Sequence, residues 1–128
     1  MSEVKPNLLY TKDHEWLEKT ATPKTARIGI TDFAQASLGD VTFLQLPAVG
    51  TEMKKGEIFG TVESVKAVSD LYAPVSGRIT KINTSLVTDP SSVNSDPFGA
   101  AWMVEVEIND ERELTTLLNA TAYQAHSQ

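Results

Sequence analysis

The sequence predicts a mostly β fold, a small barrel or sandwich with short helices at its margins. Short runs in which apolar and polar residues alternate dominate the chain, and this is the pattern of half-buried strands. Glycine and proline residues separate these runs at short intervals and mark turns. A chain of 128 residues has the length of one domain and no linker divides it, so we expect a single domain over residues 1–128.

The expected strands follow one another along the chain. Residues 25–30 (TARIGI) and 102–108 (WMVEVEI) place alternate apolar side chains on one face, as half-buried strands do. Residues 15–20 (EWLEKT) and 77–83 (GRITKIN) show a weaker form of the same pattern.

One further run, residues 41–46 (VTFLQL), changes phase midway. Val41 and Phe43 share one face at its start, whereas Leu44 and Leu46 share the other face at its end. This change predicts a β-bulge or a strand that passes from one sheet to another.

Helices are expected only at the margins of the fold. Thr31 can cap a short helix over residues 32–38, and this helix stops at Gly39, a favoured residue just past a helix end. The turn-rich segment 84–101 is long for a loop, so we expect it to wrap the core or to serve the function.

The C-terminal part of the chain predicts a helical segment, about residues 110–125. Asp110 and Glu113 have the spacing of a capping box at its start, and Asn119 can cap its last turn. Its apolar stripe, which we expect to pack on the sheet, consists of Leu114, Leu117 and Leu118.

Composition excludes several classes of function. The 17 acidic and 11 basic residues give a net charge of -6, and no basic cluster exceeds Lys54 and Lys55, so nucleic-acid binding is disfavoured. The chain has no cysteine, which excludes disulfides, a thiol nucleophile and cysteine-based metal sites. Only His14 and His126 offer imidazole, so we expect no metal site and no Ser-His-Asp triad.

The sequence also carries no sign of a membrane or of export. No run approaches the roughly 18 apolar residues of a membrane span, and the first residues lack the layout of a signal or transit peptide. We therefore expect a monomer without membrane contact. Its expected location is the bacterial cytoplasm, or the mitochondrial matrix if the chain is a processed eukaryotic one.

The chain places one lysine at the tip of a predicted hairpin, about residues 58–73. Two strand-like runs, IFGTVE and VSDLYA, are separated only by residues 64–67, with Lys66 among them. A solvated charge that keeps a turn soluble is one interpretation. Catalysis by the amine is disfavoured, because Glu63 and Asp70 favour its charged form. Covalent attachment of a cofactor is the other interpretation, because that chemistry needs an amine that protrudes on a rigid turn.

Residues 63–77, ESVKAVSDLYAPVSG, resemble the lipoyl-attachment segment of the glycine cleavage system H protein family. The resemblance extends over roughly residues 10–123. Further motifs of that family follow in the same order: YTKDHEW (10–16), IGITDFAQASLGDV (28–41), LPAVG (46–50), VNSDPFG (93–99) and NATAY (119–123). The sequence departs from the common pattern at Phe33, where the family often has His, and at Phe98, where it often has Tyr.

The resemblance implies a lipoyl-domain-like fold, a flattened antiparallel barrel-sandwich hybrid with short flanking helices. It implies that Lys66 becomes N6-lipoyllysine through a lipoate ligase or an octanoyltransferase. The lipoamide arm would shuttle the aminomethyl group of glycine from a pyridoxal phosphate-dependent glycine decarboxylase to a tetrahydrofolate-dependent aminomethyltransferase. Dihydrolipoamide dehydrogenase would reoxidise it. The protein is then a cofactor carrier and not an enzyme, with lipoate as its cofactor.

The residues around Lys66 are expected to be recognised by the modifying enzyme. These residues are Glu63, Ser64, Val65 and Ala67. Biotinyl carriers usually have Met on both sides of the lysine, so the Val65-Lys66-Ala67 tip disfavours a biotinyl carrier. A lipoyl relay that donates its group to other lipoyl domains remains an alternative on the same lysine.

The cargo on the arm would carry an ammonium, so a carboxylate partner would stabilise it. Glu15 and Asp70 are the predicted contacts of the loaded arm. His14 and Trp16 beside Glu15 are expected to combine charge with a bulky wall. The simpler interpretation is that Glu15 is a solvated strand charge and Asp70 an ordinary turn residue.

Overall fold

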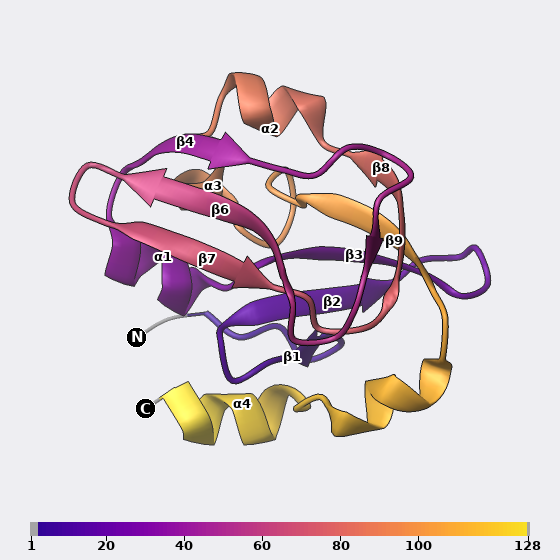
Figure 1. Cartoon of the computed structure of the whole chain (residues 1–128). Coiled ribbons are helices and arrows are strands. Elements are labelled where there is room, and N and C mark those ends of the chain that lie inside the picture. Colours follow the sequence, from indigo (N-terminus) through magenta and orange to yellow (C-terminus); the bar gives the residue numbers. More distant parts are fainter. Residues whose placement is uncertain (1–2, 128) are drawn as a thin grey trace.

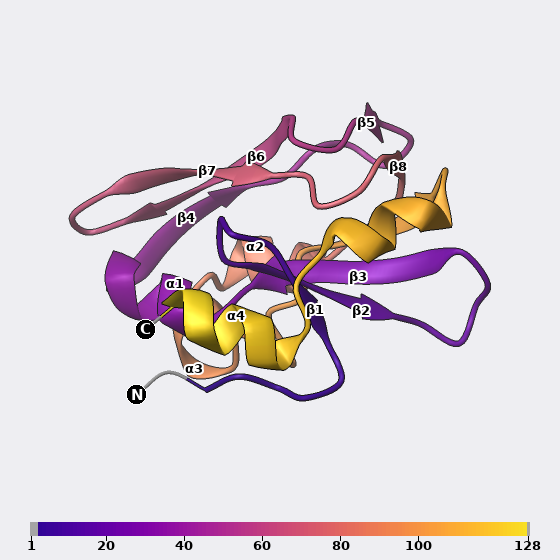
Figure 2. The same ribbon diagram turned by 90° about the horizontal axis from the view of Figure 1, so that it is seen from below.

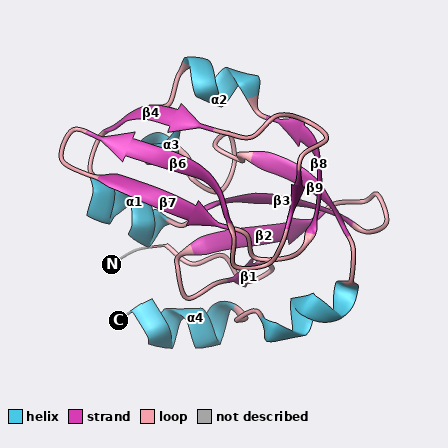
Figure 3. Ribbon diagram, in the orientation of Figure 1, coloured by secondary structure: helices cyan, strands magenta, loops and turns pink. Residues whose placement is uncertain are grey.

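The chain folds as two antiparallel sheets that face each other (Figures 1 and 2). The computed structural model describes residues 3–127, so residues 1, 2 and 128 of the predicted domain lie outside the described residues. The large sheet has the strand order β1-β2-β3-β9-β8-β5. Its strands are β1 (Leu9–Tyr10), β2 (Glu15–Lys19), β3 (Thr25–Ile30), β9 (Val104–Ile108), β8 (Gly77–Ile82) and β5 (Glu52–Met53). The predicted mostly β sandwich is confirmed, as the predominance of strands in Figure 3 shows.

The small sheet has the strand order β4-β6-β7. Its strands are β4 (Val41–Gln45), β6 (Ile58–Ser64) and β7 (Val68–Tyr72). The pairing of β4 with β6 shifts register between Val41 and Phe43, so the predicted bulge is confirmed. The expectation that Phe43 shares the face of Val41 is wrong. Val41 is buried and Phe43 is 50% exposed, because the bulge turns Phe43 outward.

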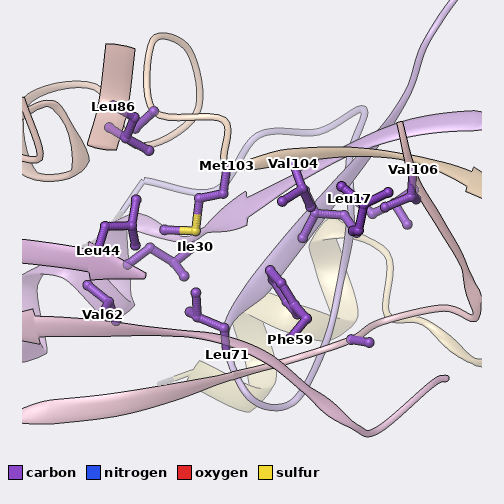
Figure 4. Close-up of a cluster of buried hydrophobic side chains, with 14 of the residues drawn as sticks. Leu17, Ile30, Leu44, Phe59, Val62, Leu71, Leu86, Met103, Val104 and Val106 are labelled. Atoms are coloured by element: carbon purple, nitrogen blue, oxygen red, sulfur yellow. The ribbon is translucent and has the colours of Figure 1, made fainter. Parts of the chain in front are cut away.

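The main core lies between the two sheets (Figure 4). Leu44, Val62 and Leu71 of the small sheet point toward residues of the large sheet such as Val104 and Val106. A second buried cluster packs on the other side of the large sheet, and it consists of Leu8, Tyr10, Trp16 and Tyr123. These buried apolar side chains supply the largest favourable contribution to folding.

Helix α1 (Asp32–Leu38) follows β3 with the predicted ends. The Thr31 side chain accepts a hydrogen bond from the Ala34 N–H at 3.2 Å, and Gly39 ends the helix with a φ of 78°. The prediction of this helix is confirmed. The helix ends shortly before β4, the strand that contains the bulge.

The long segment between β8 and β9 wraps the core, as expected. It contains two short helices that the turn-rich sequence did not predict, α2 (Thr84–Thr88) and α3 (Ser92–Ser95). Leu86 and Val93 are buried in the main core and hold the segment in place. Their isolated positions among polar residues gave no helical periodicity.

The C-terminal segment starts as the 3-10 helix η1 (Glu111–Thr116) and ends as α4 (Ala120–Ser127). Asp110 caps η1 as predicted, because its carboxylate accepts from the Arg112 N–H at 3.0 Å. The predicted role of Glu113 in a capping box is wrong, because its carboxylate accepts hydrogen bonds from the N–H and hydroxyl of Ser76 at 2.7 and 3.0 Å. Asn119 caps α4 as predicted, by accepting from the Ala122 N–H at 2.8 Å. The predicted leucine stripe does pack on the two clusters. Within residues 3–127 no helix has the length and apolar character needed to cross a membrane.

Candidate functional site

Lys66 lies at the tip of the hairpin that β6 and β7 form, and this tip protrudes from the edge of the sandwich in both Figure 1 and Figure 2. The Ser64 N–H donates to the Ala67 carbonyl at 2.8 Å. The Ser64 hydroxyl oxygen accepts from the N–H groups of Lys66 and Ala67 at 3.3 and 3.1 Å. The turn is therefore closed by its own hydrogen bonds while the Lys66 side chain remains exposed.

The tip also rests on the turn between α1 and β4. The Val65 N–H donates to the Asp40 carbonyl at 3.1 Å. A Cβ built on Gly39 would lie 3.4 Å from Cε of Lys66, so the lysine stem runs beside the end of α1. Within residues 3–127 no ion pair involves Lys66, so the expected carboxylate neighbours Glu63 and Asp70 make none with it.

A cavity of about 170 Å³ opens between α1, β2 and β7. Its apolar wall consists of Ile30, Phe33, Ala34, Leu38, Val62 and Leu71. Its acidic residues are Asp13, Glu15 and Asp70. The structure thus brings the two predicted arm contacts, Glu15 and Asp70, to one cavity. Leu38 of its wall is the residue before Gly39, against which the Lys66 stem lies.

Glu15 is 1% exposed, so the interpretation of this residue as a solvated strand charge is wrong. Its carboxylate accepts a hydrogen bond from the Thr11 hydroxyl at 2.6 Å and one from the Tyr72 N–H at 3.3 Å. Burial raises the pKa of Glu15 from its ordinary value of 4.5 to about 7, although both hydrogen bonds oppose the shift. Glu15 is therefore only partly ionised near neutral pH and can become a full carboxylate when a cation lies beside it.

Asp70 differs from Glu15 because its side chain is exposed on β7, the edge strand of the small sheet. It lies on the rim of the same cavity. The cavity therefore has one buried acid, Glu15, and two exposed acids, Asp13 and Asp70.

His14 also lines the cavity, in a backbone conformation that is uncommon for a residue other than glycine, with a φ of 71°. Its Nδ1 is 2.7 Å from the hydroxyl of Tyr123 in α4, and its ring stacks on Phe33 with centroids 4.4 Å apart. The Tyr123 hydroxyl is also 2.7 Å from the Thr31 hydroxyl. Burial and the nearby His126 lower the pKa of His14, so it is neutral at pH 7. Tyr123 thus connects His14, in the turn before β2, with Thr31 at the start of α1.

The expectation that Trp16 forms a wall beside Glu15 is wrong. Trp16 is buried in the second cluster, where its Nε1–H donates to the Pro97 carbonyl at 3.0 Å. Successive residues of a strand point to opposite faces, and this separates Trp16 from the cavity. Phe33 and the α1 side chains supply the wall instead. Their signal in the sequence is the spacing of Ala34, Ser37 and Leu38, which puts them on one helix face.

The predicted recognition residues have different environments. Val65 is 71% exposed and Ala67 is exposed, so both can contact a partner. Glu63 is partly buried on β6, and the Ser64 hydroxyl is engaged in the turn. Over the described part of the chain, no group of three or more His, Asp or Glu side chains is arranged to hold a metal ion.

Comparison with known proteins gives consistent matches over nearly the whole chain. The family model described as glycine cleavage H-protein matches residues 8–128. The glycine cleavage system H protein of Mycobacterium avium is 53% identical over 128 residues, which cover 97% of this chain and 96% of the relative. The one of Mycobacterium tuberculosis is 48% identical over 130 residues, with the same coverage. A crystal structure of a glycine cleavage system H protein from Mycobacterium marinum matches with a TM-score of 0.83 and 42% identity, covering 95% of this chain and 97% of that chain.

Proposed function

The chain belongs to the glycine cleavage H-protein family, and we propose that it is a carrier with lipoate attached to Lys66. When bound, lipoate supplies a strained disulfide on a long arm, which takes up the aminomethyl group of glycine and is later reoxidised. The chain itself supplies the attachment point, a place for the arm and a partner for the positive charge of the cargo. We propose that it does so as one domain over residues 1–128.

The observation that carries this proposal is the position of Lys66. Its amine is exposed on a turn that the Ser64 hydrogen bonds close, and its stem lies beside Gly39. A rigid turn limits where the far end of an arm can go, and the end of α1 lies between this turn and the cavity. Attachment of lipoate as an amide removes the lysine charge, and no ion pair within residues 3–127 is lost by this change.

The cavity fits such an arm in its chemistry. Its apolar wall suits the hydrocarbon part of the arm, and Glu15 and Asp70 suit a cationic cargo. An amine that keeps its proton has no free electron pair with which to expel the arm's sulfur. A carboxylate beside the ammonium would therefore slow the loss of the cargo to water.

We propose that the carrier binds in turn to three enzymes: a glycine decarboxylase, an aminomethyltransferase and dihydrolipoamide dehydrogenase. A lipoate ligase or octanoyltransferase would attach the cofactor. The matched relatives are bacterial, which favours the cytoplasm over the mitochondrial matrix for this chain.

The role of the acidic residues can be tested with Glu15→Gln and Asp70→Asn, which remove charge and keep shape. Each variant is loaded enzymatically, and the release of formaldehyde and ammonia is followed without the aminomethyltransferase. We expect faster release from both variants and unchanged reoxidation by dihydrolipoamide dehydrogenase. Slower reoxidation to the same degree would indicate damaged folding or docking, and unchanged release would reject the proposed contacts.

A further inference from the structure

The outer face of the small sheet carries an unusual row of side chains next to Lys66. The strand register pairs Phe43 with Glu63 and Glu63 with Val68, so these three residues lie side by side across β4, β6 and β7. Phe43 is 50% and Val68 is 68% exposed. We call Phe43, Glu63 and Val68 the outer row.

The fold itself does not use the outer row. The next residues along two of the strands, Leu44 and Val62, point inward and form the core, so the row faces solvent. The bulge before Phe43 is what turns this aromatic side chain outward. Within the described residues none of the ion pairs involves Glu63, which therefore presents an unpaired carboxylate between two apolar side chains.

The outer row continues to the modified lysine. Val68 follows Lys66 by only two positions, and Val65, on the other side of the lysine, is 71% exposed. Apolar surface, the carboxylate of Glu63 and the attachment point thus form a single continuous area, and Asp70 adds a second exposed acid to the same face. Aromatic side chains are enriched at interface centres, and a charge beside them can select a partner that carries the opposite charge.

We propose that the outer row is the docking surface for the enzyme that acylates Lys66, and that this enzyme presents a cationic side chain to Glu63 and apolar side chains to Phe43 and Val68. This inference rests on the proposed function, because it requires that Lys66 is modified. It adds Phe43 and Val68 to the residues that the sequence predicts for recognition.

The length of the lysine side chain selects this partner over the others. In the reaction of a lipoate ligase with lipoate and ATP, Nζ attacks the carbonyl carbon of an acyl adenylate, an amide forms, the bond to AMP breaks and two protons leave the ammonium. The four-carbon stem of lysine brings the catalytic groups of the partner close to the hairpin. Enzymes that act on the far end of a completed arm can stay further away. The acylating enzyme must therefore cover the surface beside Lys66.

The test uses the apo-protein with a purified lipoate ligase, lipoate and ATP, and it measures the initial rate of labelling by intact mass. Phe43→Ser removes the aromatic anchor. Ile58→Ser is the matched control, because Ile58 is 55% exposed at the end of β6 that is remote from the hairpin tip. We expect Phe43→Ser to lower kcat/KM by roughly 5- to 30-fold, mainly through KM. We expect Ile58→Ser to change it by less than about twofold.

A second measurement, the salt dependence of the labelling rate, tests the role of the Glu63 charge. Added salt should slow labelling of the wild type and have less effect on Glu63→Gln, because salt screens the pairing with a cation. Non-enzymatic acetylation of Lys66 should be equal in the wild type, Phe43→Ser and Ile58→Ser, since these substitutions change no charge near the amine. If Phe43→Ser fails to fold by circular dichroism, Val68→Ser takes its place, with the same expected direction.

The outcomes separate this inference from the function on which it rests. If the wild type is not labelled at Lys66, the proposed carrier function is wrong. Suppose instead that the wild type is labelled, but that the two variants Phe43→Ser and Ile58→Ser do not differ from each other in labelling rate. The proposed docking surface is then wrong, and the carrier function stands.

Discussion

The buried carboxyl group of Glu15 makes the stability of the protein depend on pH in a way that one substitution removes. The pKa of Glu15 is about 7 in the folded protein, against its ordinary value of 4.5 in an unfolded chain. The folded state therefore binds the proton of this group more tightly than the unfolded state does. The resulting stability is fully present below pH 4.5 and is lost as the pH rises to about 7.

The magnitude follows from the difference between the two pKa values. Each unit corresponds to about 1.4 kcal/mol, so the free energy of unfolding should fall by about 2 to 3 kcal/mol between about pH 5 and about pH 8 through Glu15 alone. Glu15→Gln keeps an oxygen to accept from the Thr11 hydroxyl and cannot ionise. The stability of the wild type minus that of the variant should therefore decrease by this amount across the interval.

The assay is urea unfolding of both proteins at the two pH values, followed by fluorescence and circular dichroism. Other groups, such as His14, titrate in both proteins and cancel in the difference. Parallel pH profiles for wild type and Glu15→Gln would contradict the prediction, because they would mean that Glu15 has an ordinary pKa and lies in contact with water.

Three further predictions concern the surroundings of the site. Tyr123→Phe keeps the buried ring but removes the hydroxyl that His14 and Thr31 share, so urea unfolding should show a loss of about 1 to 3 kcal/mol. Gly39→Ala places a Cβ at a φ of 78° beside Lys66, so the variant should lose on the order of 1 kcal/mol of stability in the same assay, and an unchanged midpoint would contradict the left-handed conformation. Changing both Val65 and Ala67 to Met should increase labelling by a biotin ligase, and no gain would mean that these neighbours do not discriminate between cofactors.

Those parts of the fold that depend on local pattern were predictable from the sequence. The alternation in residues 25–30, the cap at Thr31 and the turn around Lys66 each act over a few neighbouring residues. The phase change in 41–46 also predicted the bulge. It did not predict which side chain the bulge turns outward, because that depends on how β4 pairs with β6.

The parts that were wrong depend on contacts between distant segments. Glu15 and Trp16 point to opposite faces of β2, yet both are buried, because the cavity side and the α4 side of the large sheet are both covered. The alternation of polar and apolar residues along one strand cannot show that both faces of the sheet are covered by other elements. Glu113 likewise has the spacing of a helix cap, but Ser76 lies close enough to take its hydrogen bonds. In β2 and at Glu113, contacts with segments distant in the sequence decide the environment of the side chain, and the local sequence pattern does not.

The attachment of lipoate to Lys66 can be measured directly as the intact mass of the protein purified from its native host. We expect the added mass of one lipoyl group on the wild type, located at Lys66 by peptide mapping, and no addition on Lys66→Arg with an unchanged circular dichroism spectrum. A biotinyl mass, an unmodified wild type from cells grown with lipoate, or a lipoyl group that remains on Lys66→Arg would show that Lys66 is not the lipoyl attachment site.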